Sequence, residues 1–205
     1  MEPTNTNNIE KKVEPLDESK TLLKPKKKHG YFYEILKFAL IAVLIVIPFR
    51  IFIAQPFIVS GESMHPTFIN GEYLIIDELT YQFQPPARES VLIFRYPNDT
   101  SKFFIKRVIG LPGETVIIKN GIVTIKNQKN PDGITLPEPY IGEKIQDNLE
   151  KILGADEYFV LGDNRLQSYD SRYWGVLNKK YIVGRPILRL MPLTRFGIFP
   201  GDYSN

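Results

Sequence analysis

Ser63 lies in the segment SGESMHPT (residues 60–67), between Gly61, which can lead a tight turn, and Pro66, which fixes the backbone. A serine hydroxyl is a poor nucleophile unless an adjacent group takes its proton. Ser63 is therefore either an ordinary turn residue or a nucleophile. Which interpretation holds depends on whether another part of the chain supplies a base.

The choice of base is narrow, because the chain has no cysteine and only two histidines, His29 and His65. The absence of cysteine excludes cysteine nucleophiles, thiolate metal sites and disulfides. His65 is two residues from Ser63 in a turn held by Pro66, where productive contact is awkward, so we expect a surface turn residue. A Ser-His-Asp triad is therefore disfavoured. Without a His-x-x-x-His pair, no metal or other cofactor is expected.

Lys106 is the remaining candidate base, in the segment FFIKRVIGLPGE. Alternate residues of a strand share a face. Each face of this strand carries one charged residue, Lys106 or Arg107, with apolar residues beside it. At least one of these two side chains is therefore expected to be partly buried. Burial lowers the pKa of a lysine and makes its neutral amine available as a base, whereas arginine stays protonated. The alternative is an ordinary strand lysine with its amine in solvent, since sequence spacing alone does not join Lys106 to Ser63.

A third segment, GDNRLQSYDSRYWG, is too rich in polar groups to be an ordinary loop. Its short polar side chains can form turn hydrogen bonds: Asp163, Asn164, Ser168, Asp170 and Ser171. Arg165 and Arg172 can pair with the acids, and Trp174 can anchor the stretch. We interpret most of these residues as a hydrogen-bonded loop that supports a site rather than as groups that do chemistry.

The N-terminal part of the chain predicts a disordered segment followed by a membrane anchor. Residues 1–30 are polar, lack the apolar content to pack and are expected to be disordered. Residues 31–54 are mostly apolar and would extend roughly 36 Å as a helix, enough to span a bilayer. The lysines before this segment place the N-terminus in the cytoplasm. Two alternatives are weaker: a buried core helix leaves the KPKKK run unexplained, and a cleavable signal peptide needs a small residue where Phe52 stands.

Residues 55–205 are expected to form a mainly β domain on the other side of the membrane. Short β-prone runs bounded by Gly, Pro and Asn predict its strands: residues 72–79, 89–97, 102–110, 157–163 and 181–190. TVIIKNGIVTIKN predicts a hairpin, since Asn120-Gly121 favours a type I′ turn. Residues 129–156 are more polar, contain prolines and predict an insertion or a flap. The net charge of +3, without a basic cluster interleaved with aromatics, argues against nucleic-acid binding.

These segments together resemble the type I signal peptidases, membrane-bound serine peptidases that release signal peptides from exported proteins. SGESMHPTF resembles the nucleophile motif Ser-Met-x-Pro-Thr, and FIKRVIGLPGE resembles the general-base motif Lys-Arg-x-x-Gly-x-Pro-Gly. GDNRLQSYDSRYWG resembles the motif Gly-Asp-Asn-Arg…Ser-x-Asp-Ser-Arg, and MPLTRFGIF resembles the family's C-terminal pattern. The resemblance implies an antiparallel β-sheet catalytic domain of the signal-peptidase type behind one N-terminal transmembrane helix.

The resemblance also implies a role for each matching residue. Ser63 is the nucleophile, Lys106 is the general base, and Ser168 hydrogen-bonds the lysine and orients it. The supporting positions are Asp163, Asp170, Arg172 and Arg107. The backbone N–H of Ser63 is one oxyanion donor, and Gly61 stands where some members have a serine that supplies the second. The positions near the pockets for small substrate side chains match Phe57, Val59 and Ile105. The chain departs from the family pattern at Glu89-Ser90, Leu166-Gln167 and Asn178.

The implied function is cleavage of exported preproteins after small residues (Ala-x-Ala) by a serine endopeptidase, through an acyl-enzyme. Its expected partners are signal-peptide-bearing preproteins and the lipid bilayer. The expected setting is the bacterial plasma membrane, with a cytoplasmic N-terminus, an extracytoplasmic catalytic domain and activity as a monomer. Two other interpretations compete. A self-cleaving repressor-type Ser-Lys peptidase needs no anchor, and an inactive anchored paralogue that binds signal peptides needs neither Ser63 nor Lys106.

Overall fold

The computed structural model describes residues 29–52, 55–144 and 146–203. The predicted disorder of residues 1–30 therefore lies outside the described residues except at its last two positions. The end of the predicted anchor, residues 53–54, lies outside them as well.

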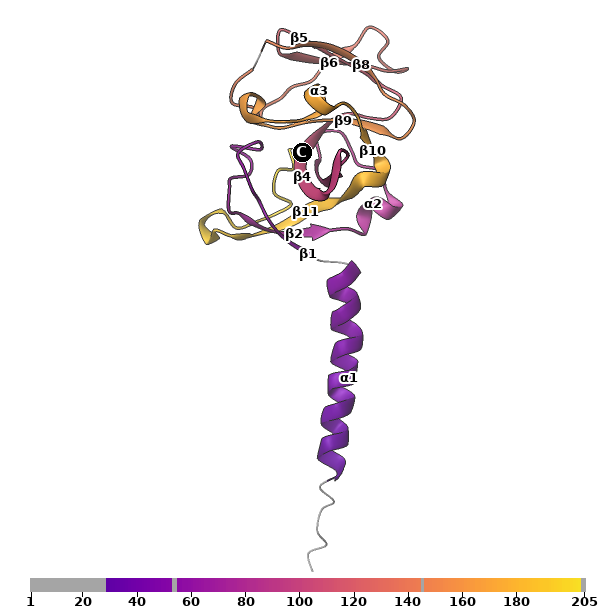
Figure 1. Cartoon of the computed structure of the whole chain (residues 1–205), viewed down its shortest axis with the longest axis vertical. Helices are drawn as coiled ribbons and strands as arrows, with labels where there is room; N and C mark the ends of the chain where they lie inside the picture. Colours follow the sequence, from indigo (N-terminus) through magenta and orange to yellow (C-terminus); the bar gives the residue numbers. More distant parts are fainter. Residues whose placement is uncertain (1–28, 53–54, 145, 204–205) are drawn as a thin grey trace, which may run out of the picture. The chain divides into compact units, whose positions relative to one another are not determined.

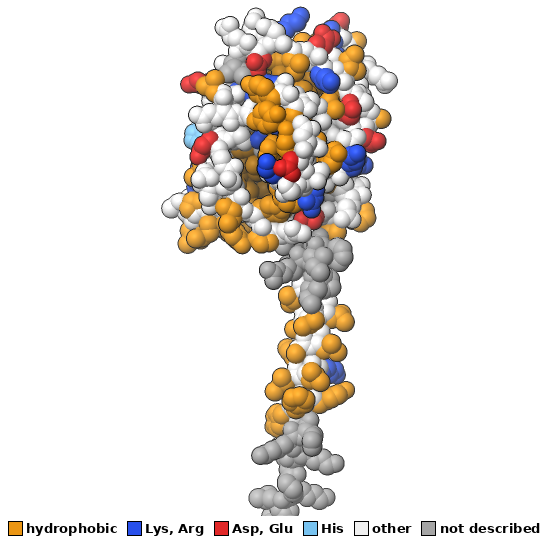
Figure 2. All heavy atoms as spheres, in the orientation of Figure 1, with side chains coloured by type: hydrophobic (Ala, Val, Ile, Leu, Met, Phe, Trp, Pro, Cys, Tyr) orange, Lys and Arg blue, Asp and Glu red, His pale blue; other side chains and the backbone are white. Residues whose placement is uncertain are grey.

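The N-terminal described part is one continuous helix of 24 residues, α1 (His29–Phe52). Its described side chains, residues 31–46, are all exposed, and most of them are hydrophobic (Figure 2). Within the described ranges, no helix combines the length and the apolar composition that crossing a membrane requires.

Residues 55–144 and 146–203 fold into two antiparallel β-sheets (Figure 1). The larger sheet has eight strands in the order β1-β2-β11-β3-β4-β9-β10, with β12 paired to β11. The bounds of these strands are β1 (Gln55–Ile58), β2 (Tyr73–Asp77), β3 (Val91–Tyr96), β4 (Asp99–Gly110), β9 (Glu157–Leu161), β10 (Leu177–Asn178), β11 (Ile182–Met191) and β12 (Gly197–Ile198). The sequence predicted β2, β3, β4, β9 and β11. It did not predict β1, β10 and β12, because runs of two to four residues carry little periodicity.

The smaller sheet has four strands in the order β7-β6-β5-β8. Their bounds are β5 (Thr115–Lys119), β6 (Ile122–Lys126), β7 (Ile134–Thr135) and β8 (Asn148–Ile152). Asn120 and Gly121 join β5 to β6 with positive φ at both positions, 50° and 74°, so the predicted hairpin is confirmed. The polar region 129–156 supplies β7 and β8 to this sheet, and neither strand was predicted.

After β1, the helices of the described residues have only three or four residues each. They are α2 (Thr80–Phe83), α3 (Ser171–Trp174) and the 3₁₀ turns η1 (Arg165–Gln167), η2 (Lys179–Tyr181) and η3 (Leu193–Arg195). The prediction of a mainly β domain is confirmed.

Hydrophobic clusters on the sheets hold the segments that carry the candidate site residues. One cluster joins the two sheets, with Ile109 of β4 packed among residues of β5, β6 and β9. A second cluster includes Val59, which precedes Ser63 in the chain, and Met64, which directly follows it, and both side chains are buried. Burying each of these two side chains contributes about 1.5–3 kcal/mol. The turn that carries Ser63 is therefore anchored in the core on both sides of the serine.

Candidate active site

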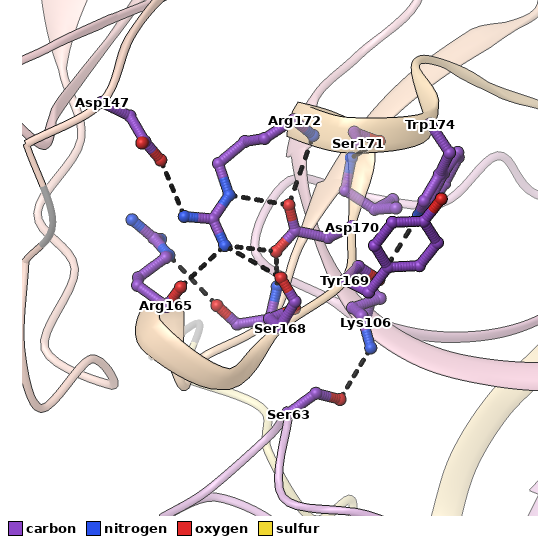
Figure 3. A network of polar contacts seen from close by, with 12 residues as sticks. Ser63, Lys106, Asp147, Arg165, Ser168, Tyr169, Asp170, Ser171, Arg172 and Trp174 are labelled. Carbon is purple, nitrogen blue, oxygen red and sulfur yellow. Dashed lines mark hydrogen bonds and ion pairs between the residues drawn. The ribbon is translucent and has the colours of Figure 1, made fainter.

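Ser63 and Lys106 meet although they come from distant parts of the chain. Ser63 lies in the turn between β1 and β2, and Lys106 lies in β4. A hydrogen bond of 2.7 Å joins Lys106 Nζ to Ser63 Oγ (Figure 3). A second one, of 3.0 Å, joins Nζ to the carbonyl oxygen of Ile105. The pair thus has the geometry of a hydroxyl next to a possible proton acceptor.

Lys106 and its neighbour Arg107 are both buried, with 4% and 0% of their surface exposed, so the prediction that at least one is buried is confirmed. Burial lowers the pKa of Lys106 to about 8, and the charges of Asp170 and Asp163 act in the opposite direction. A lysine with this pKa supplies a much larger fraction of neutral amine near neutral pH than an exposed lysine does.

The turn around Ser63 is held by the polar segment that follows β9. The backbone N–H of Asn164 donates to the Ser63 carbonyl at 3.0 Å, and its side-chain amide donates to the Glu62 carbonyl at 3.1 Å. Gly61 has a φ of +95°, a region that L side chains rarely adopt. His65, in the same turn, is exposed, as predicted.

Arg107 forms a completely buried ion pair with Asp163. Its Nε and Nη2 donate to the two carboxylate oxygens at 2.8 and 2.6 Å, and its Nη1 donates to the carbonyls of Glu89 and Gly201. Thr67 Oγ1 donates to the same carboxylate at 2.6 Å. Asp163 therefore joins the strand of Lys106 to the turn of Ser63, while Arg107 balances its charge.

Asp170 and Arg172 form a second network around the same segment (Figure 3). Arg172 Nε and Nη2 donate to the Asp170 carboxylate at 2.8 and 2.9 Å, and Nη1 donates to Asp147 at 2.8 Å. Asp170 also accepts from the Gly162 backbone N–H and caps α3. Both predicted supporting acids are thus paired with arginines, and the charge of Arg172 lowers the pKa of Lys106 while the two acids raise it.

Ser168 does not make the hydrogen bond to Lys106 that the family resemblance implied. Its Oγ is buried and has no hydrogen-bond partner among the described residues. The side chain packs against Gly162, where an added Cβ would lie 2.2 Å from Ser168 Oγ. The expected hydrogen bond with Lys106 is therefore absent in this structure, although Ser168 lies beside the Asp170–Arg172 pair (Figure 3).

A cleft of about 280 Å³ opens beside Ser63 and Lys106. Phe57, Val59 and Ile105 all line it, so the structure brings the three predicted pocket positions together at one site. Other lining residues, which the sequence did not assign to a pocket, include Ser60, Leu74, Ile93, Phe104, Gln167 and Tyr169. Leu74 and Ile93 are core residues, so this part of the wall cannot recede easily.

Two further observations concern groups that could bind an oxyanion or a metal ion. Among the described residues, the backbone N–H of Ser63 makes no backbone hydrogen bond, whereas the N–H of Gly61 donates to Asn70 Oδ1 at 3.0 Å. No cluster of three or more acidic, histidine or cysteine residues able to hold a metal ion occurs in the described part of the chain.

The chain is similar to several known proteins. Residues 32–191 match the family model described as "Signal peptidase, peptidase S26". A probable signal peptidase I-1 from Synechocystis sp. is 37% identical over 77% of this chain and 82% of its own. A signal peptidase I from Leptolyngbya laminosa is 38% identical over 77% of this chain and 78% of its own. A crystal structure of a signal peptidase I from Enterococcus faecalis V583 is 29% identical, covers 50% of this chain and 97% of that one, and has a TM-score of 0.43.

Proposed function

The chain belongs to the signal peptidase family, peptidase S26, and on this premise we propose that Ser63 and Lys106 are the nucleophile and the general base of its reaction. The family is one of serine endopeptidases that process signal peptides, and a serine nucleophile needs a base beside its hydroxyl. The observation that carries the proposal is the 2.7 Å hydrogen bond between Ser63 Oγ and the buried amine of Lys106.

The proposed reaction is acyl transfer. Neutral Lys106 takes the proton of Ser63, and Oγ attacks the carbonyl carbon of the last signal-peptide residue. The backbone N–H of Ser63 donates to the oxyanion. Protonated Lys106 then gives its proton to the leaving amine, which becomes the N-terminus of the mature protein. Water, deprotonated by the same lysine, hydrolyses the ester and restores Ser63.

The cleft supports a preference for small side chains, above all alanine, at the first and third positions before the cut. Val59 is buried and Ile105 is half-buried, and both pack against the hydrophobic cluster under the turn. A larger substrate side chain would have to displace packed core residues, which costs free energy because protein interiors are densely filled. Phe57 closes another part of the wall.

We further propose that residues 31–54 anchor the enzyme in the bacterial plasma membrane. The support is the apolar sequence of this stretch, the exposure of its described side chains, and the lysines that precede it. The N-terminus then lies in the cytoplasm and the β domain outside. An anchor raises the effective concentration of a substrate whose own signal peptide is still in the bilayer. Both catalytic groups come from one chain, which supports activity as a monomer.

The test uses the full-length protein, purified in detergent, and a preprotein with an Ala-x-Ala site. The wild type, Ser63→Ala, Lys106→Met and Lys102→Met are compared. Lys102 is the matched control, because it is an exposed lysine on the same strand, paired with Asp99. We expect the wild type and K102M to cut after the second Ala, shown by N-terminal sequencing. S63A and K106M should lose a factor of at least about 10²–10⁴ in rate.

The outcomes separate the competing interpretations. Cleavage that survives K106M would reject Lys106 as the base. A wild type that binds the preprotein without cutting it would reject the enzyme and favour a paralogue that captures signal peptides. Cleavage only in the presence of membrane or detergent micelles, lost when residues 1–54 are removed, would support the anchor.

A further inference from the structure

Three charged residues, Glu72, Arg189 and Arg195, form an ion cluster that the reaction above does not use. The Glu72 side chain is completely buried just before β2. Arg189 of β11 places Nε 3.0 Å from one carboxylate oxygen, and Arg195 of η3 places Nε 2.9 Å from the other. One carboxylate thus fixes two guanidinium groups from the C-terminal part of the chain.

The other nitrogens of these two arginines hold the turn that carries Ser63. Arg189 Nη2 donates to the Thr67 carbonyl at 2.7 Å. Arg195 Nη2 donates to the carbonyls of Pro66 and Thr67 at 3.0 and 3.1 Å. Thr67 is therefore held through its carbonyl by the arginines and through its hydroxyl by Asp163.

Glu72 also closes the loop in which Ser63 lies. The backbone N–H of Val59 donates to the Glu72 carbonyl at 2.9 Å, and the N–H of Gly71 donates to the Val59 carbonyl at the same distance. Residues 59–72 are thus tied at both ends by backbone hydrogen bonds. Near the middle of this loop, the arginines donate hydrogen bonds to the carbonyls of Pro66 and Thr67, three and four residues after Ser63.

Burying these three charged groups costs free energy that hydrophobic side chains would not cost. Burial raises the pKa of Glu72, and the two arginines act against that rise. Neither carboxylate oxygen has a well-aligned hydrogen bond within the described residues, so the contacts to the arginines are mainly ionic. Buried ion pairs often stabilise a fold no better than hydrophobic residues of similar volume. The ion pairs with Glu72 instead orient the arginines so that their N–H groups point toward the turn.

We propose that Glu72, Arg189 and Arg195 are positioning residues, which hold the nucleophile turn so that Ser63 stays within hydrogen-bond distance of Lys106. The inference rests on the proposed function of that pair. It makes the segment from Arg189 to Arg195 part of the catalytic apparatus, although none of its side chains lines the cleft. A displacement of about 1 Å at a reacting group can cost up to about 10²-fold in rate.

The experiment compares kcat and KM for the preprotein in Arg195→Ala, Arg195→Lys and Glu72→Gln, well below the unfolding temperature of each variant. Arg185→Ala is the matched control. Arg185 is on β11, as Arg189 is, and pairs with Asp77. Its side chain is 37% exposed, against 33% for Arg195, but it does not touch the turn. We expect R195A to lose about tenfold or more in kcat with KM within about twofold of the wild type. R185A should keep both constants.

Two further results test positioning rather than folding. R195K should recover only part of kcat, because one ammonium group cannot replace a fork that contacts Glu72 and two carbonyls. Millimolar methylguanidinium should restore activity to R195A and leave R185A unchanged. A kcat of R195A within twofold of the wild type would overturn this inference and leave the proposed function standing. A loss of kcat that only matches the fraction of unfolded protein would do the same. A wild type that cuts nothing would overturn the proposed function, and this inference with it.

Discussion

Lys106 and Arg107 are consecutive residues of β4 whose cations lie in opposite electrostatic settings. Arg107 is fully buried and paired with Asp163 through two hydrogen bonds. Lys106 is also buried, yet among the described residues no carboxylate lies within ion-pair distance of its amine, which contacts the Ser63 hydroxyl instead. One cation is therefore part of a structural ion pair, and the other, whose pKa burial lowers, can lose its proton.

The rate of cleavage should rise with pH through the pKa of Lys106. Burial lowers that pKa to about 8, and only the neutral amine can accept the Ser63 proton. We expect kcat to increase about tenfold per pH unit below this value and to level off above it. The measurement is kcat from about pH 6 to pH 10, with K102M as a control that keeps the wild-type profile. A profile that is flat, or that falls as the pH rises, would contradict a lysine base.

Arg107→Met should destabilise the β domain strongly, because it leaves the buried Asp163 carboxylate without its counterion. Removing one partner of a buried pair costs about 3–5 kcal/mol. The half-exposed pair of Arg185 with Asp77 is screened by solvent, so Arg185→Met should cost less than about 1 kcal/mol. Urea denaturation of both variants measures the free energy of unfolding. Equal losses in the two variants would show that the Arg107–Asp163 pair is not the structural support that its burial indicates.

Ser168→Ala should lower kcat while leaving stability unchanged or slightly higher. The Ser168 hydroxyl is buried without a partner among the described residues, so its removal takes away an unsatisfied polar group. We expect the hydroxyl to orient the lysine amine during the reaction, as the family resemblance implies. Ser171→Ala is the converse control: its Oγ accepts from the Val160 N–H at 3.0 Å, so its loss should cost about 1–3 kcal/mol of stability and little kcat. An S168A enzyme with wild-type kcat would assign Ser168 a packing role only.

Much of the fold follows from local patterns in the sequence. A short β-prone run marks β4, and Asn120-Gly121 marks the hairpin between β5 and β6, because both signals lie within a few residues. β7 and β8 were not predicted, since their polar, proline-containing surroundings show no clear alternation. Their place in the sheet depends on partners elsewhere in the chain.

The site shows the same division between local and long-range information. The burial of at least one of Lys106 and Arg107 was predictable from their apolar neighbours on β4, and the support loop was predictable from its density of short polar residues. The contact between Lys106 and Ser63 was suggested by resemblance but not by spacing, because strand pairing creates it. The link from Arg189 to Thr67 joins residues 122 positions apart and leaves no local signal. The missing Lys106–Ser168 hydrogen bond depends on side-chain geometry that no motif specifies.

Ile105→Ala should relax the preference for small residues before the cut. Ile105 is a half-buried residue of the cleft wall and lies next to Lys106, so truncating it widens the space beside the attacked carbonyl. Preproteins that end their signal peptide in Ala and in Val would be compared by kcat/KM. We expect the ratio of Ala to Val to fall by about tenfold, the order of discrimination that one or two methylene groups provide. Ile122→Ala, at an exposed residue of β6 in the smaller sheet, should leave the ratio unchanged. An unchanged ratio in I105A would mean that Ile105 is core and does not set specificity.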